Sequence, residues 1–203
     1  MNIEVRARDL LLLWAYQMKK GIRVLSIACA PFEKSDKTAL VIGVVSRGQL
    51  IEGLLSLRVS VDGNDATRVL AKKVKSSRFK DQIRLIALNG VALAGLNILD
   101  IEELSSSLKI PIMILTRKKP RLRAMSLAIK AATKNKDVAT RKLVMLNKIK
   151  KVSRICKING FYTQSIGIEK GEINLIIGEA IAMLRVAHII ASGISNGESK
   201  GRI

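Results

Sequence analysis

The segment from Arg23 to Asp62, RVLSIACAPFEKSDKTALVIGVVSRGQLIEGLLSLRVSVD, decides the fold because it predicts three consecutive β-strands. Residues 23–30 and 39–46 are short apolar runs rich in Val, Ile and Leu, and residues 54–61 carry an apolar side chain at every second position. The polar link at 31–38 opens with a proline, and the link Arg47-Gly48-Gln49 is short enough for a hairpin. Both links favour antiparallel neighbours, so the segment predicts a meander.

After the meander, helical patterns alternate with apolar strands. Asp65 is placed to act as the N-cap of a helix over residues 66–77. Continuous apolar runs at 83–88 and 110–115 are typical of strands buried on both faces, and a short helix is predicted between them at 99–108. This order of elements is that of a ribonuclease H-like fold: an α/β protein whose mixed sheet, an antiparallel three-strand meander plus parallel strands, is flanked by helices.

The remainder of the chain predicts mainly helices. Their expected ranges are 121–133, 137–152 and 174–192, with Gly193 as a stop signal. Residues 161–168 have a weaker strand pattern. With 203 residues, 48% of them hydrophobic, the chain is long enough for one well-buried core. We therefore expect a single domain over residues 22–203, preceded by a helix over residues 1–21.

The first 21 residues combine an apolar run, Leu10–Trp14, with basic residues on both sides. The run is shorter than the roughly 20 apolar residues that cross a bilayer, and no small-residue cleavage site follows it. We expect no membrane span here. The predicted helix either packs on the domain or binds a protein partner.

The charge of the chain indicates a polyanionic partner. Lys plus Arg number 36 against 16 for Asp plus Glu, a formal charge of +20. Between Arg117 and Lys157 there are 15 Lys or Arg and one acid, Asp137, which leaves only +6 for the other 162 residues. Acids would be interspersed on an ordinary solvated surface. We expect phosphate contacts from Arg117, Lys118, Lys119, Arg121, Arg123, Lys130, Lys134, Arg141, Lys142, Lys148, Lys150, Lys151 and Arg154.

Cysteine and histidine are scarce. The only cysteines are Cys29 and Cys156, and His188 is the only histidine. These counts give no disulfide framework and limit transition-metal chemistry. We expect a reducing, cytoplasmic environment.

Specific residues resemble those of an archaeal family of uncharacterised proteins related to endonuclease V, sometimes labelled endonuclease dU. The resemblance extends from about Gly21 to Arg202, and its most specific part is the tail. The residues that carry it include Pro31-Phe32, Val61-Asp62-Gly63-x-Asp65-Ala66-Thr67, Ala94-Gly95-x-Asn97, Asp100-Ile101, Arg117-Lys118-x-Pro120, Tyr162-x-Gln164, Leu184-Arg185-Val186-Ala187-His188 and Gly197-Glu198-Ser199-x-Gly201-Arg202.

The resemblance implies a ribonuclease H-like nuclease, in which carboxylates hold one or two Mg²⁺ ions. The family pattern has an Asp pair where this chain has Ala28-Cys29, and an Asp where it has Asn89. Only the turn with Asp62 and Asp65 keeps its acids. Ala offers no ligand, a thiol matches Mg²⁺ poorly, and neutral Asn does not balance a dication. We therefore expect a remnant site without catalytic residues, metal or other cofactor.

Other candidates have a structural alternative beside the functional one. Lys118 is either a phosphate contact or plain surface, and His188 is expected in the core or behind a site rather than as a general acid. Tyr162 and Gln164 either contact nucleic acid or anchor a loop. Glu198 and Arg202 follow the Gly193 signal in a polar tail that can fold back towards the remnant site.

Three functional hypotheses follow. The leading one is a non-catalytic nucleic-acid-binding protein that grips phosphates of structured RNA, with RNA favoured over DNA and the ribosome as a candidate partner. The second is a nuclease for damaged or deaminated nucleic acid that uses Mg²⁺ or Mn²⁺ with Asp62, Asp65, Glu198 and a recruited acid. The third is an adaptor that binds a protein partner through residues 1–21.

Overall fold

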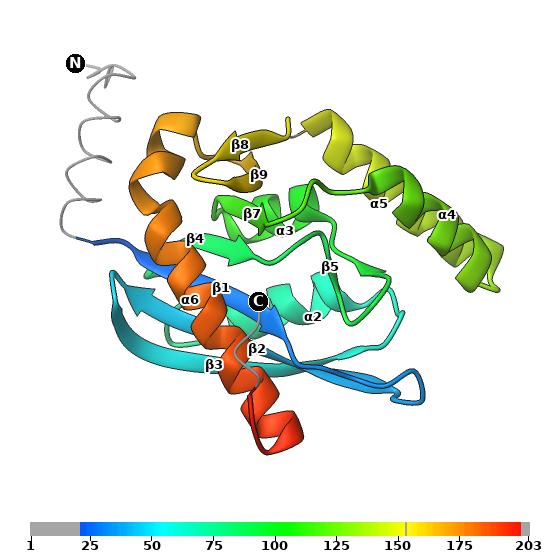
Figure 1. Cartoon of the computed structure of the whole chain (residues 1–203), viewed down its shortest axis with the longest axis horizontal. Helices are drawn as coiled ribbons and strands as arrows, with labels where there is room; N and C mark the ends of the chain where they lie inside the picture. The colour runs from blue at the N-terminus through cyan, green and yellow to red at the C-terminus, as the bar shows by residue number, and fades with distance from the viewer. Residues whose placement is uncertain (1–20, 153, 200–203) are drawn as a thin grey trace.

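The computed structural model describes residues 21–152 and 154–199. The helix predicted for residues 1–21 lies outside this part of the chain, apart from Gly21. The described residues form a seven-stranded mixed sheet with helices on both faces, and a separate two-stranded hairpin (Figure 1). The strand order in the large sheet is β3-β2-β1-β4-β7-β9-β8. This arrangement confirms the predicted fold class.

The predicted meander is present. It consists of β1 (Arg23–Cys29), β2 (Thr38–Arg47) and β3 (Leu50–Ser60), and both pairings are antiparallel. The third strand begins at Leu50, four residues before the predicted start. The chain turns tightly at Gly48, whose φ of +59° suits glycine, and a register shift between Val45 and Ser46 accommodates the turn.

Two parallel strands extend the sheet beyond β1. Helix α2 (Ala66–Lys75) leads to β4 (Ile83–Leu88), which pairs parallel with β1. A small hairpin of β5 (Ala92–Leu93) and β6 (Asn97–Ile98) follows, and then α3 (Ile101–Leu108). Strand β7 (Ile112–Thr116) pairs parallel with β4. These crossovers match the prediction, except that the small hairpin was expected only as a Gly-rich passage.

The basic segment forms two helices and one strand. Helices α4 (Leu122–Ala132) and α5 (Lys136–Val152) pack side by side at one end of the molecule (Figure 1). Strands β8 (Cys156–Ile158) and β9 (Phe161–Ile166) then complete the sheet, with β9 antiparallel to β7. The weak strand pattern at 161–168 is therefore a real strand, and β8 was not predicted.

The last helix, α6 (Lys170–Asn196), lies across one face of the sheet (Figure 1). It begins before the predicted Asn174 because Glu169 and Glu172 form a capping box at its start. The predicted end at Gly193 is wrong. Gly193 stays helical, and the helix ends at Gly197, whose φ is +76°. A glycine is tolerated inside a helix, whereas the left-handed conformation is what terminates one.

The core lies on both faces of the sheet. On one face, β1, β2 and β3 pack against α2, α3 and α5, with Leu25, Ile27, Leu70 and Leu104 completely buried. On the other face, α6 covers β1, β2 and β4. The first strand is therefore buried on both sides and sits between β2 and β4 in the plane of the sheet. The strand therefore fixes the position of the residues that follow its carboxyl end.

Replacing Gly53 with Ala should destabilise the fold by about 1–3 kcal/mol. A Cβ atom at this position in β3 would lie 2.3 Å from Cζ of the buried Phe79 ring, so that the ring has to move. Urea unfolding measures the effect, with Ser56→Ala on an exposed position of the same strand as the control. An equal stability of the two variants contradicts the prediction.

Candidate nucleic-acid interface at the carboxyl edge of the sheet

Three parallel strands end at the same edge of the sheet. Strands β1, β4 and β7 run in one direction, so that Cys29, Asn89 and Arg117 lie at or just beyond their carboxyl ends. In open α/β sheets, this edge is where ligands bind. Strand β9 starts here too, because Tyr162 pairs with Thr116 at the end of β7. Cys29, Asn89 and the start of the basic segment at Arg117 therefore lie at the same edge of the sheet.

The residues at the end of β1 face apolar surroundings. Ala28 is 2% exposed and packs in a cluster with Met183, Ala187 and Ala191 of α6. Cys29 points to the other face of the sheet, where it is half-buried. Burial raises the pKa of the Cys29 thiol, although the backbone N–H of Ala94 acts on its sulfur in the opposite direction. Neither position supplies an oxygen ligand.

Asp62 stabilises a turn through hydrogen bonds of its backbone and its side chain. It has a φ of +52°, its backbone N–H donates to Ala94 O at 2.9 Å, and its Oδ1 accepts from the backbone N–H of Leu96 at 2.7 Å. A Cβ atom on Gly95 would lie 2.3 Å from this Oδ1, so only glycine fits beside the carboxylate. These contacts tie the end of β3 to the β5–β6 hairpin.

Asp65 does not cap α2 through its side chain, and this prediction is corrected. Its carboxylate accepts from Ser60 Oγ at 2.9 Å and from Asn97 Nδ2 at 2.6 Å. The amide oxygen of Asn97 accepts the backbone N–H of Ala66 at 3.1 Å, so Asn97 supplies the cap. Partial burial raises the pKa of Asp65, but the hydrogen bonds from Asn97 and Ser60 outweigh it and leave the pKa below its usual value.

Two lysines of α5 bind oxygen atoms of the domain itself, Lys142 as a buried side chain and Lys148 as an exposed one. Lys142 is 1% exposed, and its Nζ donates to the backbone oxygen of Asp62 at 2.5 Å. Lys148 Nζ lies 3.0 Å from Oδ2 of the buried Asp100, which also caps α3 by accepting from the Glu103 N–H. Both were among the predicted phosphate contacts. Because these contacts anchor α5 to the rest of the domain, we leave Lys142 and Lys148 out of the interface.

The other predicted cations lie on the surface. Each is exposed, and none has a carboxylate within 4 Å among the residues that the structure describes. Unpaired exposed cations are available to an external anion. The set comprises Arg117, Lys118, Lys119, Arg121, Arg123, Lys130, Lys134, Arg141, Lys150, Lys151 and Arg154.

Four cations surround a groove of about 480 Å³ beside β8, which we call the basic groove. Its floor includes Leu122, Ile155 and Cys156, and the half-buried Tyr162 lies at its side with Lys157 Nζ 5.8 Å from the ring centre. The structure thus brings Tyr162 and Gln164 to the groove, Gln164 as a buried residue. The cations are Lys119, Lys150, Arg154 and Lys157.

Sequence reasoning missed Lys157 and Cys156 as members of this groove because β8 was not predicted. The sequence does contain a signal for this strand pair, because Asn-Gly is typical of a tight β-hairpin turn. Asn159 and Gly160 adopt positive φ, +47° and +82°, between β8 and β9. The hairpin sets Lys157 opposite Tyr162.

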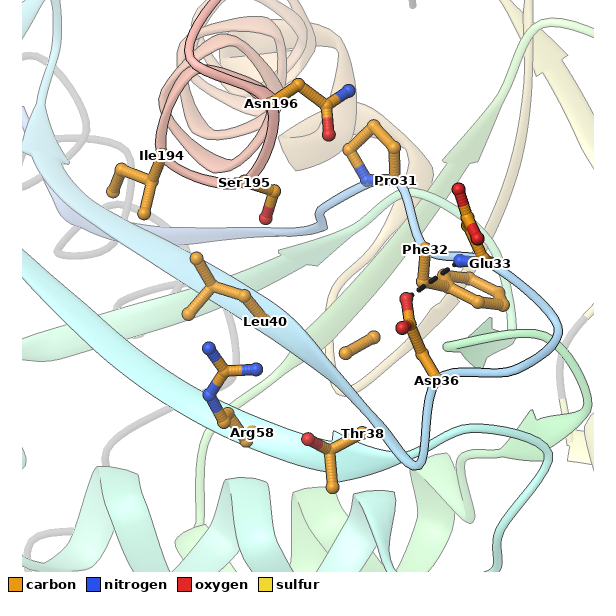
Figure 2. A pocket seen from close by; sticks show the side chains of 11 residues that line it. Pro31, Phe32, Glu33, Asp36, Thr38, Leu40, Arg58, Ile194, Ser195 and Asn196 are labelled. Carbon is orange, nitrogen blue, oxygen red and sulfur yellow. Dashed lines mark hydrogen bonds between the residues drawn. The ribbon is translucent and has the colours of Figure 1, made fainter.

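A larger groove of about 590 Å³ lies elsewhere, where the β1–β2 loop faces the end of α6 (Figure 2). Glu33, Asp36 and Arg58 line it, together with Ser195 and Asn196. Asp36 closes the loop by accepting the backbone N–H of Glu33 at 2.8 Å. The mixture of charges and the absence of a cation cluster make this groove a poor match to a polyanion.

The structure does not gather the remaining candidates into a catalytic group. His188 is half-buried in the middle of α6, and Glu198 is exposed beyond the end of that helix. Arg202 lies outside the described residues. Within residues 21–152 and 154–199, no three His, Cys, Asp or Glu side chains are grouped closely enough to hold a metal ion.

The comparisons with known proteins agree with this architecture. Human endonuclease V has a similar fold, with a TM-score of 0.50 and 12% identity over 89% of this chain and 96% of that one. The fold is thus the endonuclease V-like version of a mixed α/β sheet. A crystal structure of a protein of unknown function from Archaeoglobus fulgidus is much more similar, with a TM-score of 0.74 and 29% identity over 85% of this chain and 98% of that one.

The family model described as endonuclease dU matches residues 20–195. The chain belongs to this family. The UPF0215 protein of Thermococcus sibiricus is 38% identical over 91% of this chain and 97% of its own length. The UPF0215 protein of Methanothermobacter thermautotrophicus is 35% identical over 91% of this chain and 93% of its own length. The predicted relationship to an archaeal endonuclease V-like family is therefore confirmed.

An endonuclease fold of this kind implies a divalent cation, and the residues present do not fit one. A hard dication requires several oxygen ligands of which some are charged. At this edge, Ala28 is buried in an apolar cluster and Cys29 offers a thiol. Asp62 and Asp65 are hydrogen-bonded within the turn that they stabilise. We derive no catalytic step through a metal.

Replacing Asp65 with Asn should lower the free energy of unfolding at pH 7 by about 1–2 kcal/mol, because it removes charge-assisted hydrogen bonds. The pKa of Asp65 is below its ordinary value of 3.8 in the folded state, so this contribution is present above pH 3.8 and is lost as the pH falls through the folded-state pKa. Urea unfolding over this range measures it, with the exposed Asp81→Asn as the control. A deficit that persists unchanged in strong acid contradicts the assignment.

Lys142 should make stability rise with pH in the alkaline range. Burial lowers its pKa below the ordinary 10.5, with the Asp62 carboxylate opposing, so the unfolded chain binds more protons than the folded one between the two pKa values. The wild type should therefore gain stability relative to Lys142→Met as the pH approaches 10.5. Urea unfolding at several alkaline pH values measures this difference. The exposed Arg141→Met should show no such trend, and equal trends in the two variants contradict the prediction.

Proposed function

We propose that this protein binds the phosphates of structured RNA, ribosomal RNA included, in the cytoplasm and without cleaving it. The observation that carries the proposal is the basic groove at the carboxyl edge of the sheet. Four cations from the α4 region, α5 and β8 converge there, with Tyr162 at the side of the groove. Phosphate contacts of this kind position a nucleic acid without reading its sequence.

The distribution of acids supports the proposal. In the described part of the basic segment, Asp137 is the single carboxylate, and it lies in the first turn of α5. Among the described residues, Glu52 pairs with Arg47, and Asp100 pairs with Lys148. The exposed cations of α4 and α5 therefore keep their charge available for a polyanion.

The shape of the surface favours RNA over duplex DNA. Two packed helices and a groove form a broad basic surface, and the sequence contains no recognition-helix motif for a major groove. Tyr162 and the nearby Phe161, with Arg117 6.0 Å from its ring centre, add aromatic surface beside the groove. Binding is expected to depend on the shape and charge of the RNA more than on its sequence.

The salt dependence of RNA binding tests the proposal. Filter binding of an RNA hairpin at several salt concentrations should give a steep linear fall of log affinity with log salt, as counterions are released. The double variant Lys150→Ala/Arg154→Ala should flatten the slope by about 1 for each phosphate contact removed. The matched control is Lys80→Ala, an exposed lysine in the turn before β4 at the opposite edge.

The control should retain the wild-type slope. If the affinity of the wild type hardly changes with salt, the protein does not bind RNA through phosphate contacts. If the double variant has the same slope as the Lys80→Ala control, RNA does not bind at the basic groove, because Lys150 and Arg154 then contact no phosphate.

A further inference from the structure

A second groove with basic residues lies between α2 and α3, which pack on the same face of the sheet as α5. Its volume is about 520 Å³, and we call it the α2–α3 groove. Arg68, Lys72 and Lys75 of α2 line it, together with Glu103 of α3. All four side chains are exposed. None of the three cations has a carboxylate within 4 Å among the described residues, so their charge is available to an external anion.

The three cations belong to a stretch of sequence without acids. Residues 66–80 contain six Lys or Arg and no Asp or Glu. Arg78 lies over the ring of Phe79, 4.7 Å from its centre, and Lys73 is half-buried. The cations at positions 68, 72 and 75 instead follow one another at steps of four and three residues, which places them on one side of the helix. Helix α2 therefore presents a row of three like charges to the groove.

This row of charges opposes the stability of α2. Like charges four residues apart, such as Arg68 and Lys72, destabilise a helix. The helix dipole favours acids in the first turn, yet the first turn of α2 has no acid and carries Arg68. The dipole does favour Lys72 and Lys75, which lie in the last turn. Helix stability therefore accounts for part of the row but not for Arg68, whereas an anion bound in the groove would offset the repulsion along the whole row.

A polyanion matches the length of the row. At a rise of about 1.5 Å per residue, Arg68 and Lys75 are about 10 Å apart along the helix axis. A nucleic-acid backbone offers successive phosphates over such a length. The carboxylate of Glu103 on the α3 side of the groove repels a phosphate that comes close to it. Phosphate contacts are therefore expected along the α2 side.

We propose that the α2–α3 groove is a second contact site for phosphates of the RNA that occupies the basic groove. This inference rests on the proposed function. Helices α2, α3 and α5 form one layer, and packed helices are about 8–10 Å apart, which separates the two grooves by roughly 20 Å. Between them, α3 carries the exposed Glu102 and Glu103, partly offset by Lys148 of α5. The grooves are therefore two sites rather than one continuous patch.

The salt dependence of binding tests the second site. The probe is an RNA hairpin with a stem of about 16 base pairs, the length that shape-reading RNA-binding domains span. Arg68→Ala/Lys72→Ala should flatten the slope of log affinity against log salt by about 1 for each phosphate contact removed. The variant should fold, because alanine suits a helix and the substitution removes repulsion. The control Lys34→Ala/Lys37→Ala removes the same charge from exposed positions of the β1–β2 loop and should keep the wild-type slope.

Lysine acetylation of the wild type locates the contacts without a substitution. With the hairpin bound, Lys72 and Lys75 in the α2–α3 groove and Lys150 in the basic groove should be acetylated several-fold more slowly than in the free protein. Lys34 and Lys37 should react at the same rate with and without RNA. Mass spectrometry of the digested protein measures the rate at each lysine.

Failure of the second site is distinguishable from failure of the proposed function. If Arg68→Ala/Lys72→Ala has the slope of its control while Lys150→Ala/Arg154→Ala flattens the slope, the second site is wrong and the basic groove stands. If the affinity of the wild type hardly depends on salt, both fail. Protection of Lys72 and Lys75 by phosphatidylglycerol vesicles but not by RNA would assign the α2–α3 groove to a membrane surface and overturn the proposal.

Discussion

Burial of β1 on both faces is the constraint on which the rest of the structure depends. Leu25 and Ile27 face the helices α2 and α3, while Val24 and Ala28 face α6, and each of these side chains is at most 2% exposed. The strand therefore orders the sheet and fixes where β4 and β7 end. Any charged group at its end needs a partner that offsets burial. Here Ala28 lies in an apolar cluster and Cys29 offers a thiol, so neither position brings a carboxylate that needs such a partner.

The acids that remain at this edge serve the architecture. Asp62 and Asp65 bind backbone and side-chain donors, and Lys142 binds the backbone oxygen of Asp62 from α5. The turn after β3 is thereby tied both to the β5–β6 hairpin and to the basic helices. This network links the placement of the exposed cations of α5 to the turn at the carboxyl edge of the sheet.

Much of the fold could be predicted from the sequence because strands buried on both faces are continuous apolar runs. Strand 83–88 was predicted to the residue. The misses have physical causes: β8 is only three residues long, and Gly193 remains helical because the cost of about 1 kcal/mol for a glycine inside a helix is offset by the packing of α6 on the sheet. Inward and outward lysines look alike in a sequence, so the burial of Lys142 and the pairing of Lys148 with Asp100 required the structure. The role of Asn97 depends on contacts with Ser60 and Asp65, more than 30 residues away.

The central claim is that a nuclease-like fold here binds RNA through cations of its own and needs no metal. The most direct measurement incubates an excess of protein with a labelled RNA hairpin, in EDTA and in Mg²⁺ or Mn²⁺ at equal ionic strength, and follows affinity and product length together. The account predicts the same affinity in all three conditions and intact RNA throughout. Binding that appears only with the metal, or cleavage that EDTA abolishes, would contradict it.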